Sequence, residues 1–203
     1  MESVPSKPDG LRARKRQETL ERIAETGLRL FSRDGYEATT LDAIAEAAGI
    51  SRRTFFYYFK SKEEILVDWQ MRGFSASLHK AVLAQPSDKA PVEAVRDALL
   101  TLSAGFRTQE FISIDRVLRS SETLKARKQA IYGIHEQALH RTLVGKWPSP
   151  GCGTSLRLVA MASLGAMRIA IEDWIQAGGD QPLNSFLRTA FDELAAEFCK
   201  LSR

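Results

Sequence analysis

The sequence predicts an all-α fold, and three observations support this prediction. Apolar residues recur about every 3.6 residues along most of the 203-residue chain, as they do in amphipathic helices. Glycine and proline interrupt this pattern at intervals that suit the ends of helices. Alternation of apolar and polar residues never persists over the length of a strand. We therefore expect about nine helices, divided between a small N-terminal three-helix domain with a helix-turn-helix and a larger C-terminal helical bundle.

The predicted helices follow a short N-terminal arm. Residues 1–14 combine two prolines and a glycine with several lysines and arginines and few apolar residues, which predicts a disordered basic arm. Two interpretations of this arm remain open, namely contact with a groove of a bound nucleic acid and a solvated tail. The three-helix domain is expected over residues 15–62, with its first helix from Lys15 to Arg33. The other residues, 63–203, are expected to form the bundle, with helices at 62–83, 91–107, 110–120, 123–147, 154–177 and 182–201.

Two short helices joined by a tight turn are predicted between Thr40 and Phe59. Thr40 is a suitable N-cap, because its hydroxyl can accept a hydrogen bond from a free amide of the first helical turn. Gly49 follows the last apolar position of the first helix, where the chain must turn with positive φ. Ser51 caps the second helix, which begins near Arg52. A turn of this length that contains glycine is typical of a helix-turn-helix.

The second of these helices presents a basic and aromatic surface. Phe55 and Phe59 lie four residues apart and can both face a core, which leaves the arginines, the tyrosines and Thr54 on the other faces. Arginine can donate two hydrogen bonds to guanine, and hydroxyl groups reach phosphate oxygens. We therefore predict a helix that binds in the major groove of DNA, with a solvated helix of an ordinary bundle as the alternative. The predicted DNA contacts are Thr40, Arg52, Arg53, Thr54, Tyr57, Tyr58 and Lys62.

The charge distribution agrees with a nucleic-acid partner. The chain carries a net charge of +4 at pH 7, and its isoelectric point is about 9.2. Residues 1–62 hold 12 Lys and Arg against 9 Asp and Glu, whereas residues 63–203 hold 17 against 16. The positive surplus therefore lies with the predicted DNA-binding part, where it would attract phosphates, although the surplus is small.

The last two predicted helices indicate a homodimer. Residues 158–167 are apolar nearly all round, and such a helix must be buried on several sides. The final helix carries one broad apolar face. Two such helix pairs can form a four-helix bundle between subunits, and the alternative is that they fill only the core of one subunit. We predict a homodimer through about residues 154–201, which also suits a helix-turn-helix that reads palindromic sites in pairs.

Apolar and aromatic side chains on the central helices predict the walls of a pocket for a small-molecule effector. Residues of this kind at helical spacing also form ordinary cores, and this alternative stays open. The predicted wall residues are Phe106, Phe111, Leu118, Ile131, Met161 and Trp174. Arg168 is a candidate anchor for an anion, but Glu172 lies four residues on, which favours an ion pair within the helix.

Other classes of function find little support. His135 and His140 are five residues apart and so ~140° apart around a helix, whereas two zinc ligands on one helical face need a spacing of four. Because no catalytic Ser/His/Asp or Cys/His set and no phosphate-binding glycine loop is visible, we expect no enzyme activity, no cofactor and no metal site. Cys152 and Cys199 form no disulfide framework and suit a reduced cytoplasm. For Cys152, redox sensing and an inert loop cysteine both remain open.

The chain also lacks the signals of export and membrane insertion. No apolar segment of a signal peptide follows Met1, and no uninterrupted apolar stretch reaches the ~18 residues of a membrane span. We therefore expect a cytoplasmic, nucleoid-associated protein without a membrane partner.

Residues 15–66 resemble the DNA-binding domain of the tetracycline-repressor (TetR) family. The motifs that carry the resemblance are Leu30-Phe31, Asp34-Gly35-Tyr36, Thr39-Thr40, the run from Ile44 to Ser51 and the run from Tyr57 to Glu64. The resemblance implies an all-helical homodimer whose three N-terminal helices bind an operator half-site and whose C-terminal bundle binds a small molecule that releases the DNA. By position, it implies phosphate contacts for Thr40, Thr54, Tyr58 and Lys62, and base contacts for Arg52, Arg53 and Tyr57. This chain departs from the family pattern in having Phe56 where Tyr is usual, and two arginines where a Lys-Gly pair is common.

The C-terminal part is similar to the effector domain of regulators that sense acyl-CoA-like ligands. The similar stretches are residues 121–127, the helix that contains His135-Glu136, and residues 164–168 followed by Trp174. We therefore predict a ligand-responsive repressor that binds a palindromic operator as a homodimer and is released by a small apolar or acyl-type effector. The alternative is a ligand-independent dimeric DNA-binding protein whose C-terminal bundle only dimerises.

Overall fold

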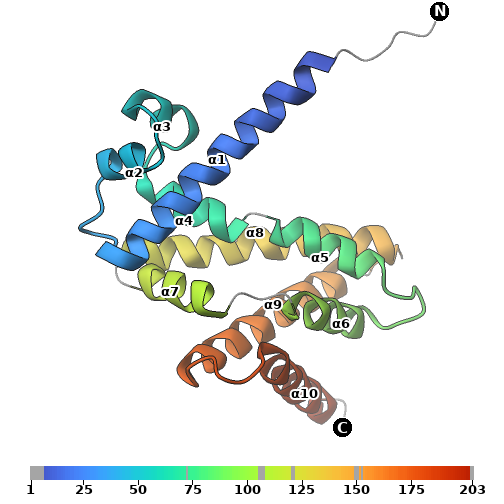
Figure 1. Ribbon diagram of the computed structural model, residues 1–203. Helices are drawn as coiled ribbons and strands as arrows, with labels where there is room; N and C mark the ends of the chain where they lie inside the picture. Colours follow the sequence, from blue (N-terminus) through green and yellow to red (C-terminus); the bar gives the residue numbers. More distant parts are fainter. Residues whose placement is uncertain are drawn as a thin grey trace, which may run out of the picture.

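The computed structural model describes residues 7–71, 73–104, 108–119, 122–148, 151 and 153–201. These residues form ten α-helices and no strand, which confirms the predicted all-α class (Figure 1). The helices are α1 (Lys7–Asp34), α2 (Leu41–Ala47), α3 (Arg52–Tyr58), α4 (Lys62–Met71), α5 (Phe74–Leu83), α6 (Pro91–Ser103), α7 (Thr108–Leu118), α8 (Glu122–Lys146), α9 (Gly153–Gln176) and α10 (Leu183–Leu201).

Helices α1 to α4 enclose the first of two hydrophobic cores. Ile23, Ile44, Phe55 and Ile65 each have no exposed surface there, and they come from the four helices in turn. Gly27 allows α4 to pack closely against α1, because a Cβ atom at this position would lie 2.7 Å from Cδ1 of Ile65. This core holds α3 at one end of the molecule, beside α2 (Figure 1). We call α1 to α4 the head.

The second core lies among α5, α6, α8, α9 and α10, which we call the body. Trp174 of α9 is its largest fully buried side chain, with 1% of its surface exposed. Its indole N–H donates to the carbonyl of Gln181 at 2.8 Å, which fixes the turn between α9 and α10. Gly178 and Gly179 take positive φ angles of 81° and 73° in this turn, as expected where the chain leaves a helix.

Helix α7 belongs to both cores. Ile114, Val117 and Leu118 of α7, with Leu124 of α8, are buried together with the head residues. At the other end of α7, Phe111 packs against the body core, and its ring centroid lies 6.2 Å from that of Trp174. The head core therefore extends beyond residue 62, the end of the three-helix domain that the sequence predicts.

Two predicted helix boundaries are wrong. Helix α1 begins at Lys7, so residues 7–14 of the predicted disordered arm are helical, and residues 1–6 lie outside the described residues. Proline is tolerated in a first helical turn, and the pair between Arg14 and Glu18 (2.8 Å) supports the helix at i, i+4 spacing. The helix expected at 62–83 is two helices, because Gly73 takes a φ of 77° between α4 and α5.

Helix α9 has the length and composition of a membrane-spanning helix. One side of it is nevertheless buried among the body helices, through residues such as Ala160, Leu164 and Ile171. Its apolar character is therefore explained in part by its position in the core.

Candidate nucleic-acid interface

The turn between α2 and α3 has the predicted cap chemistry. The hydroxyl of Thr40 accepts from the amide of Ala43 at 3.1 Å, and Ser51 accepts from the amide of Thr54 at 3.1 Å. Gly49 has a φ of 66°, and the amide of Ile50 donates back to the carbonyl of Ala45 at 2.9 Å. The two cap bonds each satisfy one free amide at the start of a helix, and the bond from Ile50 to Ala45 closes the turn between them.

Helix α3 and its C-cap face the core with Phe55 and Phe59, as predicted, and the basic residues of the helix face solvent. Phe55 and Phe59 are 0% and 3% exposed. Arg52, Arg53 and Tyr57 are exposed on the outer faces of the helix. Tyr57 keeps 66% of its surface exposed, which is unusual for so large an aromatic residue. The exposed face can therefore meet a partner without any rearrangement of the core.

The two adjacent arginines lie in different surroundings. Nη1 of Arg52 donates to both carboxylate oxygens of Asp42 on α2, at 3.0 and 3.3 Å. The guanidinium carbon of Arg52 also lies 5.7 Å from the centre of the Phe56 ring. Arg53 has no ion-pair partner in the part of the chain that the structure describes. The contact with Asp42 could not be predicted from the sequence, since no helical periodicity relates residues on either side of a turn, whereas Phe56 lies four residues after Arg52 on the same helix.

The aromatic residues of α3 are tied to their neighbours. The rings of Tyr57 and Tyr58 meet edge to face, with centroids 5.1 Å apart. The guanidinium of Arg16 on α1 lies 5.5 Å from the centre of the Tyr57 ring. Residues 11–18 of α1 are exposed, and this half of α1 extends away from the rest of the molecule (Figure 1). Basic residues of α1 therefore lie on the same side of the molecule as α3.

Thr54 and Lys62 also have contacts within the protein. The hydroxyls of Ser51 and Thr54 are 2.8 Å apart. The ammonium of Lys62 donates to the carbonyls of Tyr36 (2.7 Å) and Thr39 (3.2 Å), and it lies 4.2 Å from the centre of the Tyr36 ring. Lys62 therefore holds the loop between α1 and α2, and one of its three N–H donors is left for another acceptor.

The predicted ligand walls do not form one site. Phe106 lies outside the described residues. Phe111 and Trp174 pack together, and Ile131 is buried on α8. Leu118 instead belongs to the head core, because α7 passes from the body to the head. Met161 is 46% exposed on α9, about 140° around that helix from Trp174. The prediction that Leu118 and Met161 share a pocket with Trp174 is therefore wrong. Cys152 also lies outside the described residues.

A network of charged side chains joins α7 to α8. Asp115 and Lys128 are 2% and 7% exposed and form an ion pair at 2.6 Å. Asp115 also accepts from Arg119 at 2.5 Å, so the buried carboxylate is well satisfied. Burial, together with the charges of Asp115 and Glu172, raises the pKa of Tyr132 to about 12.

The predicted ion pair between Arg168 and Glu172 is not formed in the described part of the chain. Arg168 instead donates to the side-chain oxygen of Gln129 at 3.1 Å and lies 5.8 Å from the centre of the Tyr132 ring. The side chain therefore reaches across to α8 and does not turn along its own helix.

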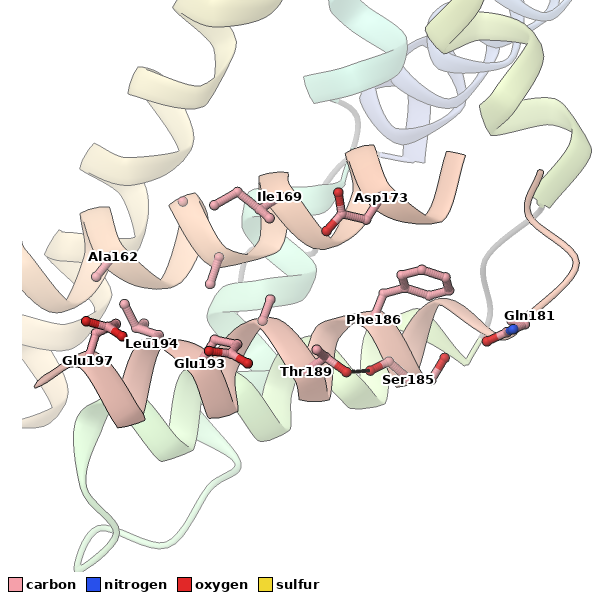
Figure 2. Close-up of a pocket in the computed structure, with 13 residues that line it drawn as sticks. Ala162, Ile169, Asp173, Gln181, Ser185, Phe186, Thr189, Glu193, Leu194 and Glu197 are labelled. Carbon is pink, nitrogen blue, oxygen red and sulfur yellow. Dashed lines mark hydrogen bonds between the residues drawn. The ribbon is translucent and has the colours of Figure 1, made fainter. Parts of the chain in front are cut away.

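A groove of about 670 Å³ lies between α9 and α10 (Figure 2). Ile169 of α9 and Phe186 and Leu194 of α10 supply apolar walls, and none of the six predicted ligand residues lines it. Asp173 and Glu193 add negative charge. The groove lies within residues 154–201, the segment predicted to form the dimer.

The sequence matches one family model and several known regulators. The family model described as bacterial regulatory proteins, tetR family, matches residues 23–68, which include α2 and α3. The transcriptional regulator TcmR of Streptomyces glaucescens is 34% identical over 116 residues. This match covers 57% of the chain and half of TcmR. A putative mycofactocin biosynthesis transcriptional regulator of Mycobacterium tuberculosis, MftR, is 29% identical over 197 residues, which cover 94% of the chain and 96% of MftR.

A solved structure shares the fold over most of the chain. The TetR-family repressor FadR of Thermus thermophilus, in complex with lauroyl-CoA, matches with a TM-score of 0.58 and 24% identity. The match covers 87% of this chain and 93% of that one. The similarity therefore extends through the body and is not limited to the head.

Proposed function

Because the chain belongs to the TetR family of bacterial regulatory proteins, we propose that it is a transcriptional repressor that binds a palindromic operator as a homodimer and is released by a small-molecule effector. Such a protein acts in the cytoplasm, on the nucleoid. The observation that carries this proposal is the exposed face of α3, where Arg52, Arg53 and Tyr57 stand on a helix fixed by a buried core.

The proposed DNA contacts follow from the exposure of each side chain. Arg52, Arg53 and Tyr57 are placed to meet base edges when α3 enters the major groove. Thr40, Thr54, Tyr58 and Lys62 lie at the edges of this surface and are proposed to contact phosphates. Phosphate contacts fix the position of the helix, whereas base contacts distinguish sequences. In a symmetric dimer, the two α3 helices would lie ~34–36 Å apart, one turn of DNA.

The groove between α9 and α10 supports a dimer on this face. Apolar side chains are exposed on these helices, with Leu158 at 60%, Ile169 at 52% and Phe198 at 54%. Exposed apolar residues on two neighbouring helices indicate a surface that is covered in the working protein. A second copy of the chain is the proposed cover, because a symmetric dimer brings two such helix pairs together.

The effector is proposed to be a small apolar or acyl-type molecule that binds within the body. FadR of Thermus thermophilus binds lauroyl-CoA, and at 24% identity this neighbour shows the fold alone. Phe111 and Trp174, where α7 meets the body core, are the proposed contacts that remain together. If α7 has two arrangements and only one suits DNA binding by the heads, an effector that binds the other arrangement more tightly would lower the fraction of protein that binds DNA.

A dimeric DNA-binding protein without an effector is the second candidate. The observation that favours it is the position of the groove between α9 and α10. The groove lies on the proposed dimer face, and none of the predicted ligand residues lines it. On this interpretation the body serves only to pair two heads.

Selection of bound fragments from random duplex DNA tests the first part of the proposal. We expect the 203-residue chain to enrich a palindrome whose half-sites lie about 10 base pairs apart. Absence of any enriched sequence at low salt would contradict it. Titration of acyl-CoA thioesters of different chain lengths against the preformed complex then separates the two candidates. Release of the DNA supports an effector, and an unchanged complex with every thioester, fatty acid and apolar drug tested favours the second candidate.

A further inference from the structure

We propose that Asp42 is a specificity-determining residue, because its carboxylate holds the guanidinium of Arg52 in position to read one base pair. This inference rests on the proposed DNA-binding function. Asp42 lies in the first turn of α2 and Arg52 in the first turn of α3. Their contact therefore joins the two helices of the helix-turn-helix across the turn, at 3.0 and 3.3 Å.

The contact with Asp42 leaves Arg52 enough hydrogen-bond donors to bind a base. A guanidinium carries five N–H donors in a plane, and Asp42 engages only those on Nη1. The three N–H groups on Nη2 and Nε are enough for a bidentate contact with the O6 and N7 atoms of guanine. Phe56, one turn along α3, supports the guanidinium with its ring at 5.7 Å. Asp42 and Phe56 thus position the guanidinium of Arg52, and its Nε and Nη2 donors remain available for DNA.

The charge of Asp42 argues against a phosphate contact for this arginine. Arg52 and Asp42 keep 61% and 64% of their side-chain surface exposed, so both would lie near a bound DNA. A carboxylate there repels the phosphate backbone and partly neutralises Arg52, which weakens attraction to DNA of any sequence. Arg53 has no such partner and keeps its full charge. The pair therefore lowers affinity for random DNA and favours a contact with a base edge.

These contacts order the side chain of Arg52 before DNA binds, which reduces the entropy lost on binding. A free arginine must lose rotamer freedom on binding, and this loss reduces affinity for the specific site roughly 2-fold to 10-fold per ordered side chain. Asp42 and Phe56 remove part of this loss. Removal of the Asp42 carboxylate should therefore weaken binding to the specific site by up to roughly 10-fold. The loss of its negative charge should strengthen binding to random DNA.

The test compares the unsubstituted 203-residue chain with the variants Asp42→Ala, Arg52→Ala, the double variant and Glu46→Ala. Glu46 is the matched control, since it is an exposed acidic residue one turn further along α2, without an ion-pair partner in the described residues. Fluorescence anisotropy gives Kd for the selected duplex, for single-base variants of it and for a random duplex. Circular dichroism confirms that each variant is folded.

We expect Asp42→Ala to lower the ratio of specific to random affinity roughly 2-fold to 10-fold, at the same base pairs where Arg52→Ala loses discrimination. In the Arg52→Ala background, the change at Asp42 should have no further effect on this ratio. Glu46→Ala should raise both affinities and leave the ratio unchanged. The inference is overturned if Asp42→Ala behaves like Glu46→Ala, or lowers the ratio equally without Arg52. A wild-type protein without preference for any duplex would overturn the proposed function itself.

Discussion

Substitution of Gly27 by alanine should destabilise the head, although alanine is the better helix former. Within an exposed helix, this change would stabilise the fold by about 0.5–1 kcal/mol. At Gly27, however, the new Cβ atom would lie 2.7 Å from Cδ1 and 3.3 Å from Cγ2 of Ile65, which has no exposed surface. Because Ile65 is fully buried, its side chain cannot move into solvent. Either Ile65 must adopt a less favourable rotamer, or α4 must shift away from α1. Overpacking of this kind costs about 1–3 kcal/mol.

The expected net effect is a loss of about 1 kcal/mol in the free energy of unfolding, which for a chain of this length lowers Tm by ~2–4 °C. Gly133 supplies the control, because it lies in the middle of α8 and a Cβ atom there meets nothing within 4 Å. Gly133→Ala should therefore stabilise the protein by up to ~1 kcal/mol. Both variants are compared by thermal unfolding at one protomer concentration, since the stability of the proposed dimer would depend on concentration.

A double-mutant cycle isolates the steric cause. Ile65→Val removes Cδ1, the atom nearest to the new methyl group. In this background, Gly27→Ala should be less destabilising by at least ~0.5 kcal/mol, which is a measurable coupling energy. If Gly27→Ala raised Tm as much as Gly133→Ala, the close packing of α1 against α4 described above would be refuted.

Three further predictions concern the body. Lys128→Met should lower the free energy of unfolding by about 3 kcal/mol in urea titrations, because it leaves the buried carboxylate of Asp115 with only Arg119, whereas the same change at the exposed Lys125 should have little effect. Ala162→Glu in the groove between α9 and α10 should yield monomers in sedimentation experiments, and the same change at the exposed Ala126 should not; a dimeric Ala162→Glu variant would contradict the proposed interface. For Asp97, burial acts to raise the pKa, but hydrogen bonds from Lys89 and Arg96 outweigh it, so the pKa is lowered on folding. The resulting stabilisation is complete above the pKa of the unfolded state and is lost as the pH falls through the folded pKa, so Asp97→Asn should show a shallower loss of Tm on acidification.

The helices and caps of the head could be predicted from sequence because their causes are local. Thr40, Gly49 and Ser51 act on amides and carbonyls within a few residues, and the positions of Phe55 and Phe59 follow from helical spacing. The start of α1 differs from the predicted start for a local reason as well. Pro8 and Gly10 suggest an irregular segment, yet they lie in the first turn of α1, where proline costs little.

Contacts between distant residues could not be predicted in this way. Leu118 has the same helical phase as Phe111, seven residues earlier, so the pattern suggests one shared environment. The two residues lie in different cores because α7 crosses from the body to the head. The contact between Asp42 and Arg52 likewise depends on the angle between two helices, and the angle is fixed by the whole head core.

The packing of α7 also limits how the two parts of the molecule can move. Ile114, Val117 and Leu118 cannot leave the head core without exposing apolar surface, and Asp115 cannot leave Lys128 without stranding a buried charge. Each of these separations costs several kcal/mol, more than the ~1–3 kcal/mol by which an effector typically biases an equilibrium. We therefore expect α7 and the first turns of α8 to move with the head as one body. The flexible boundary then lies closer to Phe111 than to residue 62, and an effector that acts on the head should do so by changing the contact between Phe111 and Trp174.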